Sequence, residues 1–258
     1  MEFVKLTYEK EGQIAIIILN RPNMHHAFNT AMAKELLATF QRVKIDEVRV
    51  VILTSSTLEA FCSGADLKER QGMSDDTWRA QRKLFEQMFQ AVANLPCPTI
   101  AAIHGYALAG GFELALNTDI IIAGENVQVG LTEVQRGIMP GGGGARLLPQ
   151  RIAPHIAKEW LFTGRVVRIE EAQQAGLFNA VVPVDEVFES ALTLAKKIAE
   201  NAPVGVRGTK KVANVSTLPV TEALAIEVAT YKKVIDTEDR LEGILAFNEK
   251  RKPNFSGR

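Results

Sequence analysis

Two glutamates occupy positions where an acidic side chain is unexpected. Glu113 lies in "GYALAGGFELAL" (105–116) and Glu133 lies in "VGLTEV" (129–134), and both stretches are otherwise largely apolar. A carboxylate removed from water is unfavourable unless it is paired, hydrogen-bonded or protonated. Each glutamate therefore either lies on a solvated face or points into a polar pocket within an apolar wall. Two carboxylates in one pocket would suit general acid–base catalysis.

Two glycine-containing turns could supply backbone donors beside these acids. "SGADLK" (63–68) follows an apolar run that suits a buried strand, and "LAGGFE" (108–113) leads into a helix whose first amides have no partner within the helix. Glu113 follows Gly110 by about one helical turn. Two N–H groups that converge from separate loops form an oxyanion hole. The spacing leaves a second interpretation open, in which the glycines allow close packing and the glutamates are exposed.

Several other catalytic and binding motifs are missing. The glycines at 141–144 lack the Lys-Ser/Thr of a P-loop, no G-x-G-x-x-G follows a strand, and no G-x-S-x-G is present. His25 and His26 are adjacent, so they cannot share one face of a helix or strand as metal ligands do. We expect them at the surface or at a pocket rim, and we expect no metal site.

The elements that must position these groups alternate between strand and helix. After two strands joined by a turn at 10–13, apolar spacing predicts a helix from Thr30 and a loop at 60–69, and Ser74 is the expected N-cap of a helix that ends before Pro96. The first two predicted strands are 3–9 and 14–20, the others are 48–56, 99–105 and 119–124, and helical spacing occurs at 170–177, 185–200, 221–235 and 238–252. The pattern predicts one α/β core followed by helices.

Composition restricts the class of protein. The 258 residues carry 30 basic and 30 acidic side chains, so the formal net charge is zero. This balance weighs against general affinity for nucleic acid or for an anionic membrane. Cys62 and Cys97 have no metal-like or redox-like spacing, and no apolar run reaches membrane-spanning length. We therefore expect a soluble, cytoplasmic protein with reduced thiols.

Long segments of the chain resemble the crotonase superfamily, which comprises enoyl-CoA hydratases and isomerases. The resemblance covers nearly the whole chain and lies in "AFCSGADLKE", "IAAIHGYALAGGFELALNTDIIIA", "VGLTEVQRGIMPGGGGARLLPQRI", "GRVVRIEEAQQAGLFNAVV" and "DRLEGILAFNEKRKPNF". It implies a spiral of repeated β-β-α units over residues 1–195. It also implies a helical region over 196–258 that contacts coenzyme A (CoA) and builds homotrimers or dimers of trimers.

The resemblance also implies roles for particular residues. The oxyanion amides would be those of Ala65 and Gly110, and the catalytic acids would be Glu113 and Glu133. The other substrate or CoA contacts that it implies are Ala27, Asp66, Leu67, Lys68, Pro140, Gly141, Phe247 and Lys250. The chain departs from the common pattern in two places, with His26 before Ala27 and with Phe112 where a smaller residue is frequent.

Because both glutamates are present, the resemblance favours a hydratase that adds water across the C2–C3 double bond of a 2-enoyl-CoA. The substrate carries CoA, and no metal or redox cofactor is expected. Other acyl-CoA reactions stay open, namely isomerisation, thioester hydrolysis and decarboxylation. So do a narrower hydratase, acting on methylglutaconyl-CoA, and a non-catalytic RNA-binding or scaffold protein. The segment 68–85 is expected to vary the floor of the acyl pocket.

The C-terminal segment combines a helix signal with a possible nucleotide contact. Thr237 is the expected N-cap, Pro253 is expected to end the helix, and Phe247 and Lys250 would share a helix face. The resemblance implies that the ring contacts adenine and the ammonium contacts phosphate, on CoA bound mainly by the adjoining subunit. The alternative is an amphipathic surface helix with a basic end.

Overall fold

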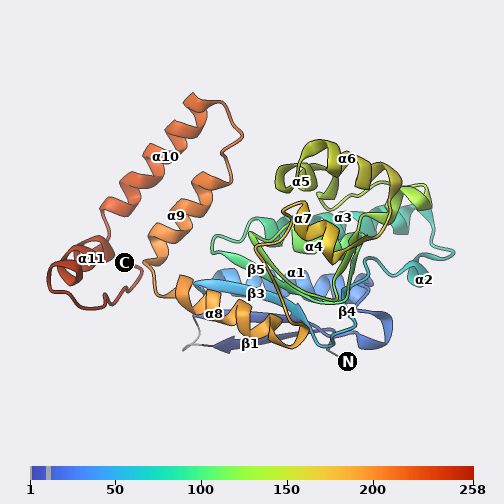
Figure 1. Cartoon of the computed structure of the whole chain (residues 1–258), viewed down its shortest axis with the longest axis horizontal. Helices are drawn as coiled ribbons and strands as arrows, with labels where there is room; N and C mark the ends of the chain where they lie inside the picture. Colours follow the sequence, from blue (N-terminus) through green and yellow to red (C-terminus); the bar gives the residue numbers. More distant parts are fainter. Residues whose placement is uncertain (1, 10–12) are drawn as a thin grey trace.

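Two β-sheets form the centre of the molecule (Figure 1). The computed structural model describes residues 2–9 and 13–258, so most of the turn predicted at 10–13 lies outside the described residues. Within them, the larger sheet has the strand order β1(Val4–Glu9), β2(Ile14–Leu19), β3(Val50–Ser55), β5(Thr99–Ile103), β7(Ile120–Gly124), β10(Ala180–Val182). The smaller sheet has the order β4(Ala60–Cys62), β6(Tyr106–Leu108), β8(Gln128–Gly130), β9(Val167–Arg168).

A β-β-α unit repeats along the chain. β3 enters the larger sheet, β4 enters the smaller one, and the helices α2(Leu67–Arg70) and α3(Asp75–Ala93) follow. The same order returns in β5, β6 and α4(Gly110–Leu116), and in β7, β8 and the 3-10 helix η2(Thr132–Arg136). The parallel pairing of β3 with β5 and of β5 with β7 stacks these units side by side. The predicted α/β spiral is confirmed.

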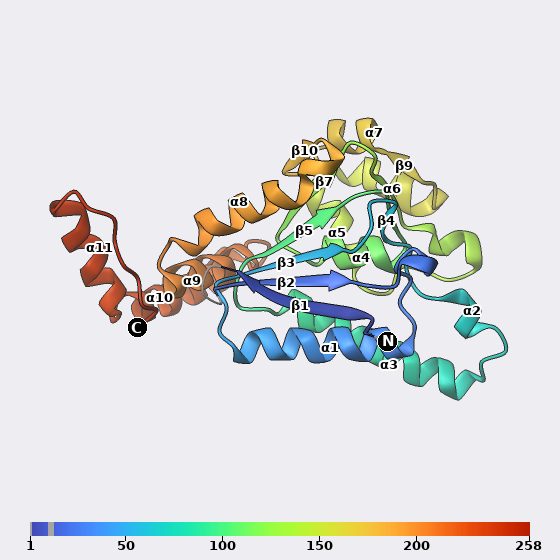
Figure 2. The ribbon, with the colours of Figure 1, turned by 90° about the horizontal axis from the view of Figure 1, so that it is seen from below.

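The larger sheet is covered on both faces. α8(Val187–Ala199) lies on one face, and α1(Thr30–Ile45) and α3 lie on the other (Figure 2). Alternate residues of a strand point to opposite faces, so Ala15 and Ile17 join the core beneath α1 and α3, while Ile14 and Ile16 join the core beneath α8. This two-sided burial explains why the central strands read as continuous apolar runs.

Most predicted elements are present, with local corrections. Asn29 and Ser74 cap α1 and α3 through side-chain hydrogen bonds to backbone amides. The segment 60–69, predicted as a loop, contains β4 and the start of α2, because Cys62 pairs with Ala107 of β6 across a short parallel ladder. α5(Gly144–Arg151) and α6(Pro154–Thr163) lie between β8 and β9 in the chain, and α7(Ile169–Gln174) lies between β9 and β10.

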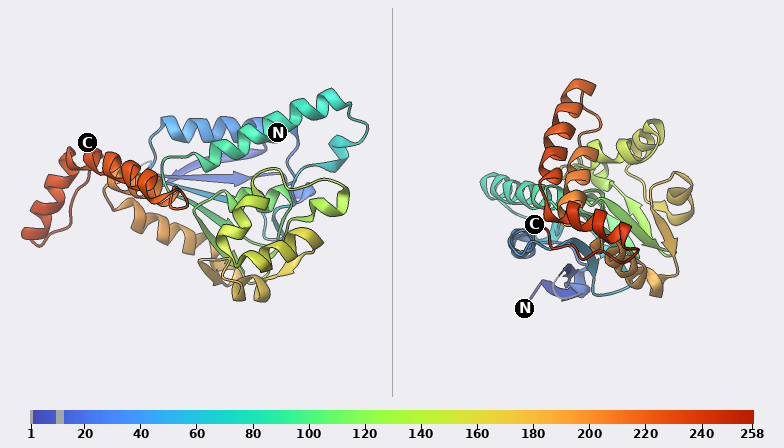
Figure 3. Two further views of the ribbon diagram at one scale, coloured as in Figure 1. Left: turned by 90° about the horizontal axis from the view of Figure 1, so that it is seen from above. Right: turned by 90° about the vertical axis from the view of Figure 1, so that its left-hand side faces the viewer.

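The last helices form an arm that projects from the core (Figures 1 and 3). We use "the arm" for residues 203–248, which contain α9(Pro203–Ala213), α10(Val220–Ile235) and α11(Glu238–Asn248). The domain boundary predicted at 195/196 falls inside α8, whose Ala199 is still buried in the core, and the division stays a prediction. Across the described residues, no helix has both the length and the hydropathy needed to cross a bilayer.

Candidate active site

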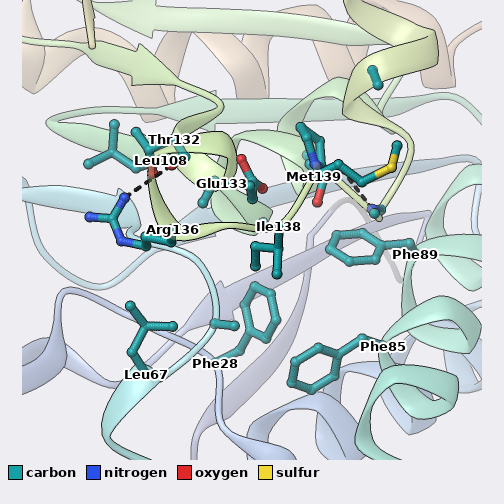
Figure 4. Close-up of a pocket in the computed structure, with 18 of the residues that line it drawn as sticks. Phe28, Leu67, Phe85, Phe89, Leu108, Thr132, Glu133, Arg136, Ile138 and Met139 are labelled. Atoms are coloured by element: carbon teal, nitrogen blue, oxygen red, sulfur yellow. Dashed lines mark hydrogen bonds between the residues drawn. The ribbon is translucent and has the colours of Figure 1, made fainter. Parts of the chain in front are cut away.

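A cavity of about 990 Å³ lies between the loops of the smaller sheet and α3 (Figure 4). Most of the residues that the sequence nominated contribute to its wall. The nominated residues that line it are Ala65, Leu67, Gly110, Glu113, Glu133, Pro140 and Gly141. Segments from four different parts of the chain therefore meet at one site.

The backbone amides of Ala65 and Gly110 are available to a ligand. Phe28 N–H donates to Gly64 O (2.8 Å) and Asp66 N–H donates to Phe28 O (3.0 Å). This parallel bridge turns the N–H of Ala65 itself away from Phe28. Gly110 begins α4, whose first internal bond is Glu113 N–H to Ala109 O (3.0 Å). Within the part of the chain that the structure describes, neither the Ala65 nor the Gly110 N–H has an acceptor.

The two amides belong to turns that pack directly on each other. Gly64 has φ +98°, and a Cβ on it would lie 3.0 Å from Ala109 Cβ and 3.2 Å from Gly110 N. Glycine therefore both permits this backbone conformation and allows the close approach. Ala109 has φ +48°, which is uncommon for a residue with a side chain, and its N–H is held by Gly130 O (2.7 Å). The strained residue sets the direction in which α4 starts.

Glu113 is the buried acid whose carboxylate is held by backbone donors. Its side chain is 3% exposed, and Oε1 accepts from Gly142 N–H (2.7 Å) and Gly144 N–H (2.8 Å). Burial raises the pKa of Glu113, and the amide hydrogen bonds oppose that rise. The hydrogen bonds compensate the carboxylate for lost water, so Glu113 does not lie on a solvated face.

Glu133 is buried in a different way. It belongs to η2 and is 7% exposed, and its Oε2 has no hydrogen-bond partner among the described residues. Burial, together with the negative charge of Glu113, raises the pKa of Glu133 to about 7. Close to neutral pH the proton therefore resides more readily on Glu133, while the amides of Gly142 and Gly144 favour the ionised form of Glu113.

An aromatic wall continues from the oxyanion site. Phe28 packs edge-to-face on Phe85 and on Phe89, with ring centroids 4.9 and 6.1 Å apart (Figure 4). A Cβ on Gly110 would lie 2.6 Å from Phe28 Cζ, so this wall begins at the Gly110 amide. Phe85 belongs to the segment 68–85 that we expected to shape the acyl pocket, and Arg70 and Trp78 of the same segment also line the cavity. The segment therefore lines the cavity, and its expected role in varying the acyl pocket stays a prediction.

Ala27, Asp66 and Lys68 were nominated as substrate or CoA contacts, but they do not line this cavity. Arg21 donates to Ala27 O (2.8 Å) and forms an ion pair with Asp66 (2.7 Å), and Asp66 also caps α2 by accepting from Lys68 N–H (2.9 Å). In this chain Ala27 and Asp66 therefore fix the loops, and Lys68 is exposed. Their contacts with CoA stay a prediction.

Phe247 and Lys250 lie on or next to α11, away from the cavity of the same chain (Figure 1). The prediction that they share a helix face is wrong. α11 ends at Asn248, and Lys250 has φ +54° in a C-terminal cap closed by Arg251 N–H to Ala246 O (3.0 Å) and Lys250 N–H to Phe247 O (3.2 Å). Phe247 is 82% exposed, so its ring is available to an external group.

The expectation of a surface or rim position holds for His25 but is wrong for His26. His25 is exposed, but His26 is fully buried, with Nδ1 accepting from Arg21 N–H (3.0 Å) and Nε2 within 3.0 Å of Thr57 Oγ1. Burial lowers the pKa of His26 to about 4, so the ring is neutral and structural. No cluster of potential metal ligands occurs among residues 2–9 and 13–258.

Sequence reasoning did not find all of the lining residues. Arg82 lines the cavity and donates to Gly141 O (2.6 Å), and Arg136 lines it and donates to Thr132 O (3.1 Å; Figure 4). Arginines on helices are usually solvated, so their spacing gave no signal of a pocket. Ile138 and Met139 complete the wall opposite the phenylalanines (Figure 4).

Comparison with known proteins gives the family. The model of the enoyl-CoA hydratase/isomerase family matches residues 9–258. Enoyl-CoA hydratase domain-containing protein 2, mitochondrial, of Mus musculus is 39% identical over 98% of this chain and 87% of its own length. Methylglutaconyl-CoA hydratase, mitochondrial, of Homo sapiens is 39% identical over 96% of this chain and 75% of its own length.

Solved structures agree with this result. The crystal structure of an enoyl-CoA hydratase from Bacillus anthracis superposes with a TM-score of 0.96 and 40% identity, covering 100% of both chains. An enoyl-CoA hydratase from Mycobacterium tuberculosis H37Rv gives a TM-score of 0.89 and 32% identity over 99% of both chains. With its sequence, its spiral of β-β-α units and its cavity in agreement, the chain belongs to the enoyl-CoA hydratase/isomerase family.

Proposed function

We propose that the protein is an enoyl-CoA hydratase that adds water across the C2–C3 double bond of a 2-enoyl-CoA. The observation that carries the proposal is the pair of buried acids in one cavity with two unpaired amides. Glu113 is held by two backbone donors and Glu133 has an unpartnered oxygen. Hydration needs one group that accepts a proton from water and one that donates a proton to carbon. The amides that hold Glu113 favour its ionised form, and the raised pKa of Glu133 favours its protonated form, so Glu113 suits the first role and Glu133 the second.

The proposed reaction starts with the thioester oxygen between the amides of Ala65 and Gly110. Glu113 takes a proton from water as its oxygen bonds to C3, and the electron pair of the double bond moves to C2 and the thioester oxygen. The two amides stabilise this enolate, and loss of one such donor typically slows a reaction about 10²–10³-fold. Glu133 then protonates C2, and proton exchange with solvent restores both acids.

In this proposal, activation comes from the thioester itself. CoA enters with the substrate. The thioester oxygen, held by two amides, supplies the activation, so the proposal invokes no metal ion, and hydration is redox-neutral, so it invokes no redox cofactor. The role of the protein is to hold the thioester oxygen, the water and the two carboxyl groups in a site with little water access. Neither nucleic acid nor a membrane is part of the proposed function.

A narrower hydratase is the second candidate. Methylglutaconyl-CoA hydratases of Mus musculus and Homo sapiens are each 39% identical to this chain over 96% of its length. Isomerisation, thioester hydrolysis and decarboxylation would use the same oxyanion site with other acids. A non-catalytic RNA-binding or scaffold role would leave the buried Glu113–Glu133 pair without a purpose, although it costs stability.

The test is the hydration of crotonyl-CoA, followed by the loss of the absorbance of its conjugated thioester. We expect turnover by the wild type, a fall in kcat of about 100-fold or more for Glu133→Gln with little change in KM, and wild-type behaviour of Glu189→Gln, which changes an exposed acid on α8. Near wild-type turnover by Glu133→Gln would contradict the assignment. Tight, salt-sensitive RNA binding without hydration would favour the non-catalytic alternative.

We also propose that the arm mediates assembly into a homotrimer or a dimer of trimers, and that Phe247 and Lys250 meet CoA at the adjoining subunit. Helices α10 and α11 expose apolar side chains, among them Val220 (82%), Tyr231 (65%) and Leu241 (58%). Several large apolar side chains exposed on two helices favour a subunit contact. Sedimentation tests this proposal. The wild type and the control Lys232→Glu should sediment as a trimer or a hexamer, whereas Leu224→Glu should dissociate. A monomeric wild type would contradict the proposal.

The location stays a prediction. The sequence favours the cytoplasm, whereas three of the similar proteins, from Mus musculus, Homo sapiens and Bos taurus, are named as mitochondrial enoyl-CoA hydratase domain-containing proteins.

A further inference from the structure

The ring of His26 closes the loop 21–28, which contains the 3-10 helix η1(Pro22–Met24). The ring is fully buried and does not line the cavity. Its Nδ1 accepts from Arg21 N–H (3.0 Å), and the backbone N–H of His26 donates to Arg21 O (3.0 Å). Because Nδ1 accepts a hydrogen bond, the ring proton is on Nε2, which donates to Thr57 Oγ1 at 3.0 Å.

The backbone of this loop is unfavourable without such a closure. His25 (φ +47°) and His26 (φ +54°) are consecutive residues in the left-handed region, which residues with a Cβ rarely adopt. Strained backbone of this kind persists only where the surrounding structure holds it. The bonds from His26 to Arg21 and to Thr57 are the contacts that hold it here.

The two left-handed residues bind the chain just before Ala65. The carbonyl of His25 accepts from Ser63 N–H (3.0 Å), and the carbonyl of His26 accepts from Cys62 Sγ (3.1 Å). The direction of each carbonyl follows from the backbone conformation of its residue. The turn that carries the Ala65 amide is therefore tied to the conformation that the His26 ring maintains.

The same loop also binds both neighbours of Ala65. Phe28 donates to Gly64 O (2.8 Å) and accepts from Asp66 N–H (3.0 Å). The side chain of Arg21 forms an ion pair with Asp66 (2.7 Å). Ala65 is thus held on either side by the loop that His26 closes, and its own N–H is left for a ligand.

The ring can accept from Arg21 only while it is neutral. Burial lowers the pKa of His26 to about 4, and the other groups that act on it are His104 and His25, which lower it further, and Glu59, which raises it. Protonation would place an N–H on Nδ1 against the Arg21 N–H. The closure of the loop therefore depends on an unprotonated ring.

We propose that His26 is a positioning residue, whose neutral ring closes the loop 21–28 and thereby aims the Ala65 amide at the thioester oxygen. The inference rests on the proposed function, which gives that amide its role. The Gly110 amide belongs to the start of α4, and the two acids belong to α4 and η2. Removing the ring should therefore displace one oxyanion donor and leave the other donor and both acids in place.

The first test is hydration of crotonyl-CoA by two variants of His26. His26→Asn offers Oδ1 as an acceptor in place of Nδ1, whereas His26→Leu leaves the Arg21 N–H unpaired. For His26→Leu we expect kcat to fall about tenfold to hundredfold with little change in KM, since one donor is displaced and not removed. His26→Asn should stay within about threefold of the wild type. His155→Asn, which changes an exposed histidine of α6, is the control and should change neither constant.

The second test observes the thioester oxygen without turnover. Butyryl-CoA has the same thioester but no double bond, so it binds without being hydrated. In the wild type, two N–H donors should lower the infrared C=O stretching frequency of bound, carbonyl-labelled butyryl-CoA relative to the free thioester. His26→Leu should lose about half of that shift, because one of two donors is displaced, and His26→Asn should keep it. A thermal melt of each variant reports whether it is folded.

Each outcome decides the role of the ring. If His26→Leu loses turnover but keeps the full frequency shift, the ring does not act through the Ala65 amide and the inference is overturned. Wild-type turnover by His26→Leu, or an equal loss in His26→Asn, overturns it as well. If the wild type does not hydrate crotonyl-CoA, the proposed function fails, and the frequency shift of butyryl-CoA still decides the positioning. Should His26→Leu not fold, His26→Gln replaces it, because glutamine can donate to Thr57 Oγ1 but has no acceptor at the position of Nδ1.

Discussion

The cavity and the arm place side chains against their usual preference in opposite ways. The cavity buries acids, with Glu113 3% and Glu133 7% exposed, whereas the arm exposes apolar side chains, with Val220 and Phe247 both 82% exposed. A buried acid costs stability and is useful where a proton must move. An exposed apolar face costs stability until another surface covers it. The difference indicates that the core contains the proposed chemistry and the arm the proposed contacts between subunits.

The largest effect should come from removing the base in the cavity. Glu113→Gln keeps an oxygen that can accept from Gly142 and Gly144, so the fold should be retained. Hydration of crotonyl-CoA should fall in kcat by about 100-fold or more, with little change in KM. Steady-state kinetics and a thermal melt measure the two effects, and a melting temperature that falls with the rate would indicate a structural role for Glu113 instead.

Glycine substitutions sharpen the contrast in packing. A Cβ on Gly111 in the core would lie 2.0 Å from Cys62 O, so Gly111→Ala should lower the free energy of unfolding by about 3 kcal/mol or more. In the arm, Gly205 of α9 has its nearest such neighbour at 4.0 Å. Gly205→Ala should therefore raise the free energy of unfolding by about 0.5–1 kcal/mol. Urea denaturation of both variants tests this, and two destabilised proteins would contradict the contrast.

Titration of Glu133 should appear in stability as well as in rate. Its pKa is about 7 in the folded protein against a usual 4.5, so the folded state holds the proton more tightly than the unfolded state does. The wild type should therefore lose stability as pH rises from about 4.5 through 7, whereas a glutamine does not titrate. At about 1.4 kcal/mol per pH unit, the free energy of unfolding of Glu133→Gln should exceed that of the wild type by up to about 3 kcal/mol at pH 8.

Urea denaturation of wild type and Glu133→Gln at pH 5 and pH 8 measures this difference. An equal difference at both pH values would mean that Glu133 is not the titrating group. In turnover, protonated Glu133 acts as the acid, so kcat/KM for hydration should decline as pH rises through about 7.

The smallest effect should come from the arm. Lys250→Ala should raise KM for a CoA thioester several-fold and make it less dependent on salt, with kcat nearly kept, because one contact to phosphate is lost. A pantetheine thioester, which lacks the nucleotide, should be unaffected. Lys252→Ala changes a neighbouring exposed lysine and is the control. If both substrates weaken equally, Lys250 supports the fold or the assembly and does not bind the nucleotide.

The sequence by itself determined the elements and the nomination of the acids. Caps at Ser74 and Thr237, apolar runs of buried strands and helical spacing are short-range patterns, because hydrogen bonds and side-chain periodicity act between near neighbours in the chain. Glu113 and Glu133 were found because an acid within an apolar run is costly wherever the run is buried.

Only the tertiary structure decided what holds and surrounds these acids. The amides that bind Glu113 come from Gly142 and Gly144, about thirty positions along the chain, and no local pattern connects them. The same holds for Arg70, whose surroundings depend on how α3 packs against the cavity. Lys250 was misplaced because glycine usually marks the left-handed residue after a helix, and here a lysine occupies it. Interactions between distant residues select these conformations, so their signals are absent from the local sequence.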